Sequence, residues 1–279
     1  MRPYDALILD LDGTLLEDSG EIPARNTRAL QRISNEGIHV MIATGRSEQS
    51  AKPVIEALGI LNPTVIYNGA AIWCPKEDRL IEERNLNIDH LECLLNYAET
   101  EDLLPVVMCA GSKRALSPRN EALQYALHDM KNIEIVSPSQ MRIERPIRLS
   151  LFSDRHHDTE SFACKVRALS PIEAYLTWFP LNLLPSHRDS PLQVVDVQPL
   201  CEGKNEALRF LQEKMGISPQ RCVAVGDAPN DIPMVEAAGL GIAMGNAMEE
   251  LKEVADRVIG DNNAAAIADL VDELWPETP

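Results

Sequence analysis

The sequence predicts an α/β fold: a doubly wound, Rossmann-like parallel sheet with an inserted, mixed α+β domain. Two observations predict the parallel sheet. Short apolar runs alternate with helical patterns, and each run is followed by a polar break, most of which contain glycine. A third observation predicts the insertion, because the middle of the chain has few glycine-marked breaks of this kind. We expect the core to cover residues 1–82 and 190–279, and the inserted domain, a cap, to cover residues 83–189.

The first apolar run, Ala6 to Leu9, lacks the spacing of an amphipathic helix and predicts a strand buried on both faces. Asp10 and Asp12 follow it directly. Side chains alternate along an extended chain, so these two carboxylates would leave the sheet on the same side, about 6 to 7 Å apart. Gly13 then permits a sharp turn and a close approach of a ligand to the backbone.

Two other interpretations of this stretch are open. Asp-Gly after an apolar run is often a plain turn. A calcium loop would use Asp10, Asp12 and Glu21 as its first, third and twelfth positions. The sixth position, however, is Leu15 instead of glycine, and a strand instead of a helix leads into the loop.

The rest of the core repeats the alternation of strand and helix. Polar breaks should lie at the carboxyl ends of the strands, where open parallel sheets bind ligands. The breaks contain Thr44-Gly45-Arg46, Asn68-Gly69-Ala70 and Gly226 to Asp231. The predicted strands are 40–43, 64–67, 222–225 and 240–243, and the predicted helices are 22–37, 47–59, 204–215 and 264–274.

The middle of the chain predicts a hairpin followed by strands and helices without a parallel-sheet pattern. The hairpin joins residues 71–74 and 79–82, and a helix begins near Asp89. The further predicted strands are 106–109, 133–136, 147–152, 175–179 and 192–197, and the further helices are 120–128 and 159–169.

Composition excludes several classes of partner. The 279 residues carry a net charge of −17, which opposes binding to nucleic acid or to an anionic membrane, and aromatic residues make up only 4%. No apolar run reaches membrane-spanning length, and Asp5, Asp10 and Asp12 interrupt the N-terminal stretch that a signal peptide would need. The six cysteines form no C-x-x-C pair and predict reduced thiols in a cytoplasmic protein. His156-His157 predicts an exposed polar loop instead of a metal site. The oligomeric state is left open.

Taken together, the breaks resemble the motifs of the haloacid dehalogenase superfamily, and within it those of the Cof-type phosphatases. The matching pieces occur in the family's order and, with their flanking elements, cover about half of the chain. They are Asp10-Leu-Asp12-Gly13-Thr14-Leu15-Leu16, Thr44-Gly45-Arg46, Asn68-Gly69-Ala70, Lys204 ahead of a helix, Gly226-Asp227 with Asn230-Asp231, and Ala243-Met-Gly-Asn-Ala247.

The resemblance implies a role for each matching residue. Asp10 would attack phosphorus and become an aspartyl phosphate, and Asp12 would act as general acid and then as general base. Asp10, Asp227, Asp231 and the main-chain carbonyl of Asp12 would hold Mg²⁺. The transferring phosphate would be bound by Thr44, Gly45, Arg46, Lys204 and Asn230.

Charge repulsion supports the implied cation. Two carboxylates ~5 Å apart repel by roughly 3 kcal/mol at an effective dielectric constant near 20. Asp10, Asp12, Asp227 and Asp231 could therefore converge only around a divalent ion, and hard oxygen ligands favour Mg²⁺ over zinc. A helix N-cap is the alternative role for residues 227–231.

The expected function is hydrolysis of small phosphate esters, with sugar phosphates ahead of nucleotide monophosphates, flavin mononucleotide and pyridoxal phosphate. A phosphomutase and a phosphate-ligand sensor without turnover are the alternatives on the same fold. A dehalogenase is disfavoured, because carbon chemistry needs neither Lys204 nor the acidic quartet.

Overall fold

The computed structural model describes residues 3–128, 130–170 and 172–277, which form two compact units. The first unit contains residues up to 82 and from 202 onward, and the second contains residues 83–201. The sequence analysis placed residues 190–201 with the core, but they belong to the second unit. The reason is β11 (Gln193–Pro199), which pairs along its length with β9 (Arg148–Ser153) and β10 (Ala174–Pro180).

A parallel five-stranded sheet forms the centre of the first unit, in the order β14-β13-β12-β1-β2. The strand β1 (Ala6–Leu9) is fully buried, as its unbroken apolar run predicts. The other strands are β2 (His39–Ile42), β12 (Cys222–Gly226), β13 (Leu240–Ala243) and β14 (Arg257–Val258). The sequence analysis missed β14, a strand of two exposed residues without an apolar run.

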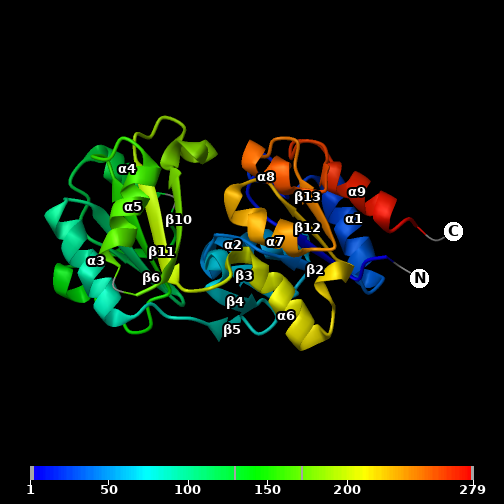
Figure 1. The fold of residues 1–279 in the computed structure, drawn as a ribbon, viewed down its shortest axis with the longest axis horizontal. Helices are drawn as coiled ribbons and strands as arrows, with labels where there is room; N and C mark the ends of the chain where they lie inside the picture. Colours follow the sequence, from blue (N-terminus) through cyan, green and yellow to red (C-terminus); the bar gives the residue numbers. More distant parts are fainter. Residues whose placement is uncertain (1–2, 129, 171, 278–279) are drawn as a thin grey trace. The chain divides into compact units, whose positions relative to one another are not determined.

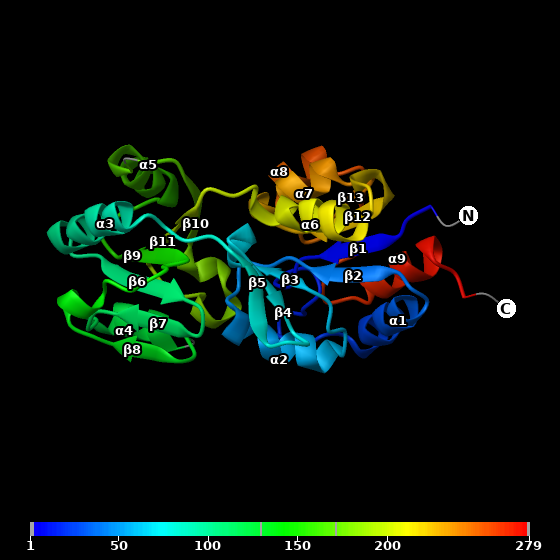
Figure 2. The same cartoon turned by 90° about the horizontal axis from the view of Figure 1, so that it is seen from below.

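Helices cover both faces of this sheet, which confirms the doubly wound fold (Figures 1 and 2). On one face, α1 (Ala24–Asn35) packs against α9 (Ala266–Leu274). On the other lie α6 (Glu206–Met215), α7 (Ile232–Ala237) and α8 (Glu249–Val254). The unit also contains α2 (Glu48–Leu58) and a small sheet of β3 (Thr64–Ile66), β4 (Ala71–Cys74) and β5 (Arg79–Glu83).

The direction of winding reverses at β1. The chain proceeds from β1 to β2 and then to β3, which meets the end of β2 through a parallel bridge between Ala43 and Val65. When the chain returns, it builds β12, β13 and β14 on the opposite side of β1. The carboxyl ends of β1 and β12 therefore flank the switch point, where open α/β sheets bind their ligands.

The second unit is an α+β domain built on a six-stranded sheet in the order β10-β11-β9-β6-β7-β8. Here β6 (Leu104–Cys109), β9, β10 and β11 pair antiparallel, whereas β7 (Ser112–Ala115) and β8 (Ile133–Ile135) pair in parallel. The sequence analysis missed β7, because its segment Ser-Lys-Arg-Ala has no strand pattern. The helices are α3 (Ile88–Thr100), α4 (Glu121–His128) and α5 (Thr159–Leu169). Leu94 of α3 and Phe162 of α5 belong to the same buried cluster as Leu149 and Val195 of the sheet.

Candidate active site

The first acidic loop begins where β1 ends and does not stay extended. Asp10 continues the sheet for one residue, because its amide donates to the carbonyl of Val225 at 3.1 Å. The chain then turns, with the carbonyl of Leu11 accepting from the amides of Leu15 and Leu16 at 3.0 and 2.9 Å. The spacing predicted for an extended Asp10-x-Asp12 segment therefore does not apply. Asp10 is buried, whereas the side chain of Asp12 is 52% exposed.

The turn requires glycine at position 13. Its φ is +76°, a value that side chains rarely tolerate, and a Cβ atom there would lie 2.3 Å from Oδ2 of Asp227. Gly13 thus lets the loop after β1 approach the loop after β12. The approach brings together two segments that are more than 200 positions apart in the chain.

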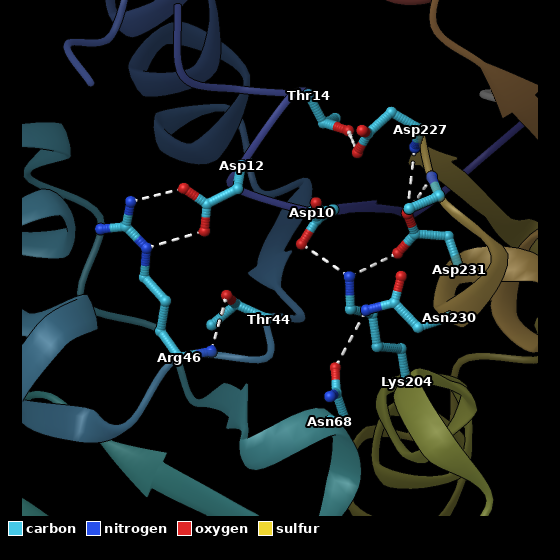
Figure 3. A network of polar contacts seen from close by, with 11 residues as sticks. Asp10, Asp12, Thr14, Thr44, Arg46, Asn68, Lys204, Asp227, Asn230 and Asp231 are labelled. Atoms are coloured by element: carbon cyan, nitrogen blue, oxygen red, sulfur yellow. Dashed lines mark hydrogen bonds and ion pairs between the residues drawn. The ribbon is translucent and has the colours of Figure 1, made fainter. Parts of the chain in front are cut away.

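A cluster of three acids and one lysine lies between these loops, with Asp10, Asp231 and Lys204 buried and Asp227 partly buried (Figure 3). The Lys204 Nζ donates to Oδ1 of Asp10 at 2.7 Å and to Oδ1 of Asp231 at 2.6 Å. The second oxygen of Asp231 accepts from the backbone amides of Asp227 and Ala228, each at 3.0 Å. Asp231 thus closes the loop after β12 by reaching back to the amides that precede it, as the third residue of a capping box does, and it also binds the lysine.

Burial and mutual repulsion shift the pKa values in this cluster. Burial raises the pKa of Asp10 well above its ordinary value, and Asp231 and Asp227 oppose the lowering effect of Lys204. The pKa of Asp227 is raised to about 7 by burial and then by the charge of Asp231. Burial alone would lower the pKa of Lys204, but Asp10 and Asp231 together raise it. The ammonium stays charged, and one positive charge faces three carboxyl groups.

The donor set fits a hard divalent cation. Asp10, Asp227 and Asp231 each offer a carboxylate oxygen, and these oxygens lie within 4.8 Å of one another. The raised pKa values of Asp10 and Asp227 indicate that the metal-free cluster lacks positive charge. Oxygen-only ligands favour Mg²⁺, Ca²⁺ or Mn²⁺ over zinc. The side chain of Asp12 is outside this group.

Asp12 points to the other side of the site and binds Arg46 (Figure 3). The guanidinium donates through Nε to Oδ2 at 2.8 Å and through Nη2 to Oδ1 at 2.5 Å, a bidentate pair. The amide of Arg46 donates to Oγ1 of Thr44 at 3.1 Å. Since a hydroxyl can accept and donate at once, this bond leaves Thr44 able to donate its hydrogen. In this structure the guanidinium of Arg46, a predicted phosphate ligand, binds Asp12.

Asn230 and Gly45 both lie close to the side chain of Asn68. The Asn230 side chain, which was expected to orient Asp10 or the phosphate, donates through Nδ2 to Oδ1 of Asn68 at 3.1 Å. A Cβ atom on Gly45 would lie 3.0 Å from that same oxygen. Asn68, which has a left-handed backbone with φ 49°, therefore connects the loops after β2, β3 and β12.

Two further residues support the site and had no role in the sequence analysis. Thr14 is buried and donates through Oγ1 to Oδ1 of Asp227 at 3.1 Å. Asn246 donates to the carbonyl of Gly13 at 2.8 Å and accepts from the amide of Asn262 at 3.0 Å. Both residues lie within the sequence motifs given above, and the motifs were the signal that could have placed them in the site. The motifs do not indicate the hydrogen-bond partners of these residues.

A family model described as haloacid dehalogenase-like hydrolase matches residues 7–271. Two curated relatives come from Bacillus subtilis (strain 168). One, a 5-amino-6-(5-phospho-D-ribitylamino)uracil phosphatase, is 26% identical over 98% of both chains. The other, the phosphatase YwpJ, is 27% identical over 96% of this chain and 99% of its own.

Solved structures share the fold. A crystal structure of TM0651 from Thermotoga maritima has a TM-score of 0.79 and 25% identity, and the match covers 97% of both chains. The subclass IIB sugar phosphatase BT4131 has a TM-score of 0.81 over 98% of this chain and 100% of its own. At 21% identity, this second match supports the fold alone.

None of the helices in the described part of the chain combines the length and the apolar character needed to cross a bilayer.

Proposed function

Because the chain belongs to the family of haloacid dehalogenase-like hydrolases, we propose that it is a Mg²⁺-dependent phosphatase of small phosphomonoesters. Membership of this family confirms the resemblance drawn from the sequence motifs. The observation that carries the proposal is the contrast within one loop. Asp10 is buried among two further acids and Lys204, while Asp12, two residues on, is half exposed and held by Arg46. Two carboxylates in such different surroundings suit a nucleophile and an acid–base catalyst.

The metal would be held by the side chains of Asp10, Asp227 and Asp231 and by the main-chain carbonyl of Asp12. Lys204 holds the carboxylates of Asp10 and Asp231, and Thr14 holds that of Asp227. When bound, Mg²⁺ would screen the phosphate charge from the attacking carboxylate.

In the first half-reaction, a carboxylate oxygen of Asp10 forms a bond to phosphorus and the ester P–O bond breaks. Lys204 orients Asp10 through Oδ1 and favours its ionised form, and its charge opposes the charge on the transferring oxygens. Asp12 gives its proton to the leaving alcohol oxygen. The products are the free alcohol and a phosphoryl group on Asp10.

In the second half-reaction, water attacks the same phosphorus atom and the bond to Asp10 breaks. Asp12, now ionised, takes the proton from this water, and inorganic phosphate leaves. Arg46 steadies Asp12 through both of its oxygens. The phosphate oxygens would be bound by Thr44, through its hydroxyl, and by Gly45, through its amide.

Sugar phosphates are the first substrates to test. The name of one curated relative supports a small phosphate ester with a sugar-like chain, because that protein is a 5-amino-6-(5-phospho-D-ribitylamino)uracil phosphatase. Inside the second unit, the cap, we expect side chains that select the leaving group. We also propose a cytoplasmic location, because the cysteine pattern predicts reduced thiols.

A panel of phosphomonoesters, assayed for phosphate release with Mg²⁺ and with EDTA, tests this function. We expect release from at least one sugar phosphate, with activity lost in EDTA and restored by Mg²⁺. Isomerised sugar phosphate without phosphate release would indicate the phosphomutase alternative. Binding without either product would indicate the sensor. Undiminished activity after complete metal removal would overturn the metal assignment.

A further inference from the structure

Arg209 of α6 lies at the place where the chain leaves and re-enters the first unit. The chain leaves this unit after Glu82 and returns at Glu202. The guanidinium of Arg209 contacts Glu82 through Nη2 and Glu206 through Nε. Glu206 in turn accepts from the backbone amide of Glu202 through Oε1 at 3.2 Å. Glu82 and Glu202 are thus the two crossing points of the chain, and a single arginine connects them through the carboxylates of Glu82 and Glu206.

The connection differs from an ordinary surface ion pair. The side chain of Glu206 is only 1% exposed, and those of Arg209 and Glu82 are 21% and 23% exposed. Arg209 also pairs with Glu213 at 2.7 Å, but Glu213 is 54% exposed and lies on the same helix. Buried ion pairs add little net stability compared with apolar side chains of similar size, so stability alone is a weak reason for this arrangement.

The same network encloses the turn that carries Lys204. Gly203, Lys204 and Asn205 form a single 3-10 turn before α6, and the bond from the Glu202 amide to Glu206 spans it. This turn is packed tightly against the loop after β3. A Cβ atom on Gly69 would lie 2.1 Å from the carbonyl of Gly203 and 3.1 Å from Cγ of Glu206. The backbone that places Lys204 thus has little room to shift while Glu206 stays in place.

We propose that Arg209 is a positioning residue for Lys204. Through Glu82 and Glu206 it ties both crossing points of the chain to the turn that brings Lys204 to Asp10 and Asp231. Arginine suits this task because its planar guanidinium can bind two carboxylates at once, which a lysine ammonium at the same place cannot do with the same geometry. Its effect on catalysis rests on the proposed phosphatase function.

The test compares Arg209→Lys, Arg209→Met and Glu82→Gln with Glu213→Gln as the matched control. We expect kcat for the best phosphomonoester to fall on the order of tenfold in both Arg209 variants, with a smaller change in KM. Glu82→Gln should give part of this loss, and it leaves Glu206 paired, which protects the fold. Glu213→Gln should keep the kcat of the unmodified protein. Combining Arg209→Met with Glu82→Gln should add no further loss, because both remove the same connection.

Hydrogen exchange measured by mass spectrometry gives a readout that does not depend on activity. At a temperature well below unfolding, Arg209→Met should speed amide exchange in peptides covering 80–85 and 199–206, and Glu213→Gln should not. A lower melting temperature with unchanged kcat and unchanged exchange in both segments would overturn the inference. If the unmodified chain hydrolyses no phosphomonoester, the proposed function fails, whereas the exchange measurement still tests the connection.

Discussion

Two acids in one short loop, Asp10 and Asp12, lie in opposite surroundings. Asp10 is buried beside two other carboxyl groups, and Lys204 is the ammonium that binds it. Asp12 is half exposed, and both of its carboxylate oxygens accept hydrogen bonds from the guanidinium of Arg46. The comparison shows that two carboxyl groups close in sequence can differ in protonation and reactivity. Burial and nearby charges determine these properties, and both differ between Asp10 and Asp12.

The largest expected effect comes from the buried member of the pair. Asp10→Asn removes the attacking oxygen, so phosphate release should fall by roughly 10⁴-fold or more, while the fold is retained. Steady-state kinetics and circular dichroism measure the two properties. Activity equal to that of the unmodified protein would remove Asp10 from the mechanism.

The exposed member should give a smaller effect that depends on the leaving group. Asp12→Asn removes the proton donor, and kcat for a sugar phosphate should fall by roughly 10²- to 10⁴-fold. With p-nitrophenyl phosphate, whose leaving group needs little protonation, formation of the aspartyl phosphate should be slowed much less. Rapid-mixing measurements of p-nitrophenol release can detect this first step. An equal first-step loss for both esters would argue that Asp12 has some other role.

Substitution of Arg46 tests whether its bidentate pair with Asp12 contributes to catalysis. Arg46→Lys keeps the charge but cannot bind both oxygens of Asp12 in the same geometry, so we expect about a tenfold fall in kcat for a sugar phosphate. Arg257→Lys is a matched control, because Arg257 makes a bidentate pair with Glu273 at 2.6 Å on both contacts, and neither residue belongs to the site. Similar losses in both variants would indicate a general effect on the fold.

The smallest expected effect is on stability and depends on pH. In EDTA, the folded protein holds protons on Asp10 and Asp227 that the unfolded chain has already lost between about pH 4 and pH 7, because both pKa values are raised on folding. The stability linked to these protons is present at low pH and is lost as pH rises through about 7. The melting temperature should therefore drop on the order of 5 °C between pH 5 and pH 8.

Added Mg²⁺ should reverse this drop, with a larger gain at pH 8 than at pH 5, because metal binding and protonation compete for the same oxygens. Asp227→Asn is the control, since it lacks one of the titrating groups and should show a weaker dependence on pH. A Mg²⁺ gain that is equal at both pH values would contradict the assignment of these carboxylates to the metal.

Much of the fold could be predicted because its signals are local. The apolar run before Asp10 and the polar breaks after β2, β3 and β12 identified the parallel sheet and its ligand-binding edge. The second boundary was misplaced because β11 lies close in sequence to the core but pairs with β9 and β10. Strand pairing joins segments that are distant in sequence, and the residues of a strand do not indicate which strands it pairs with.

The sequence motifs were sufficient to indicate the family, the edge of the sheet that carries the acids, and the set of Asp10, Asp227, Asp231 and Lys204. The hydrogen-bond partners of the site residues became apparent in the folded structure. In this structure Arg46 donates to Asp12, Asn230 donates to Asn68, and Thr14 donates to Asp227. A motif indicates the type of side chain at a strand end, but its hydrogen-bond partners depend on backbone turns and on other segments, here 34 to 213 positions away in the chain.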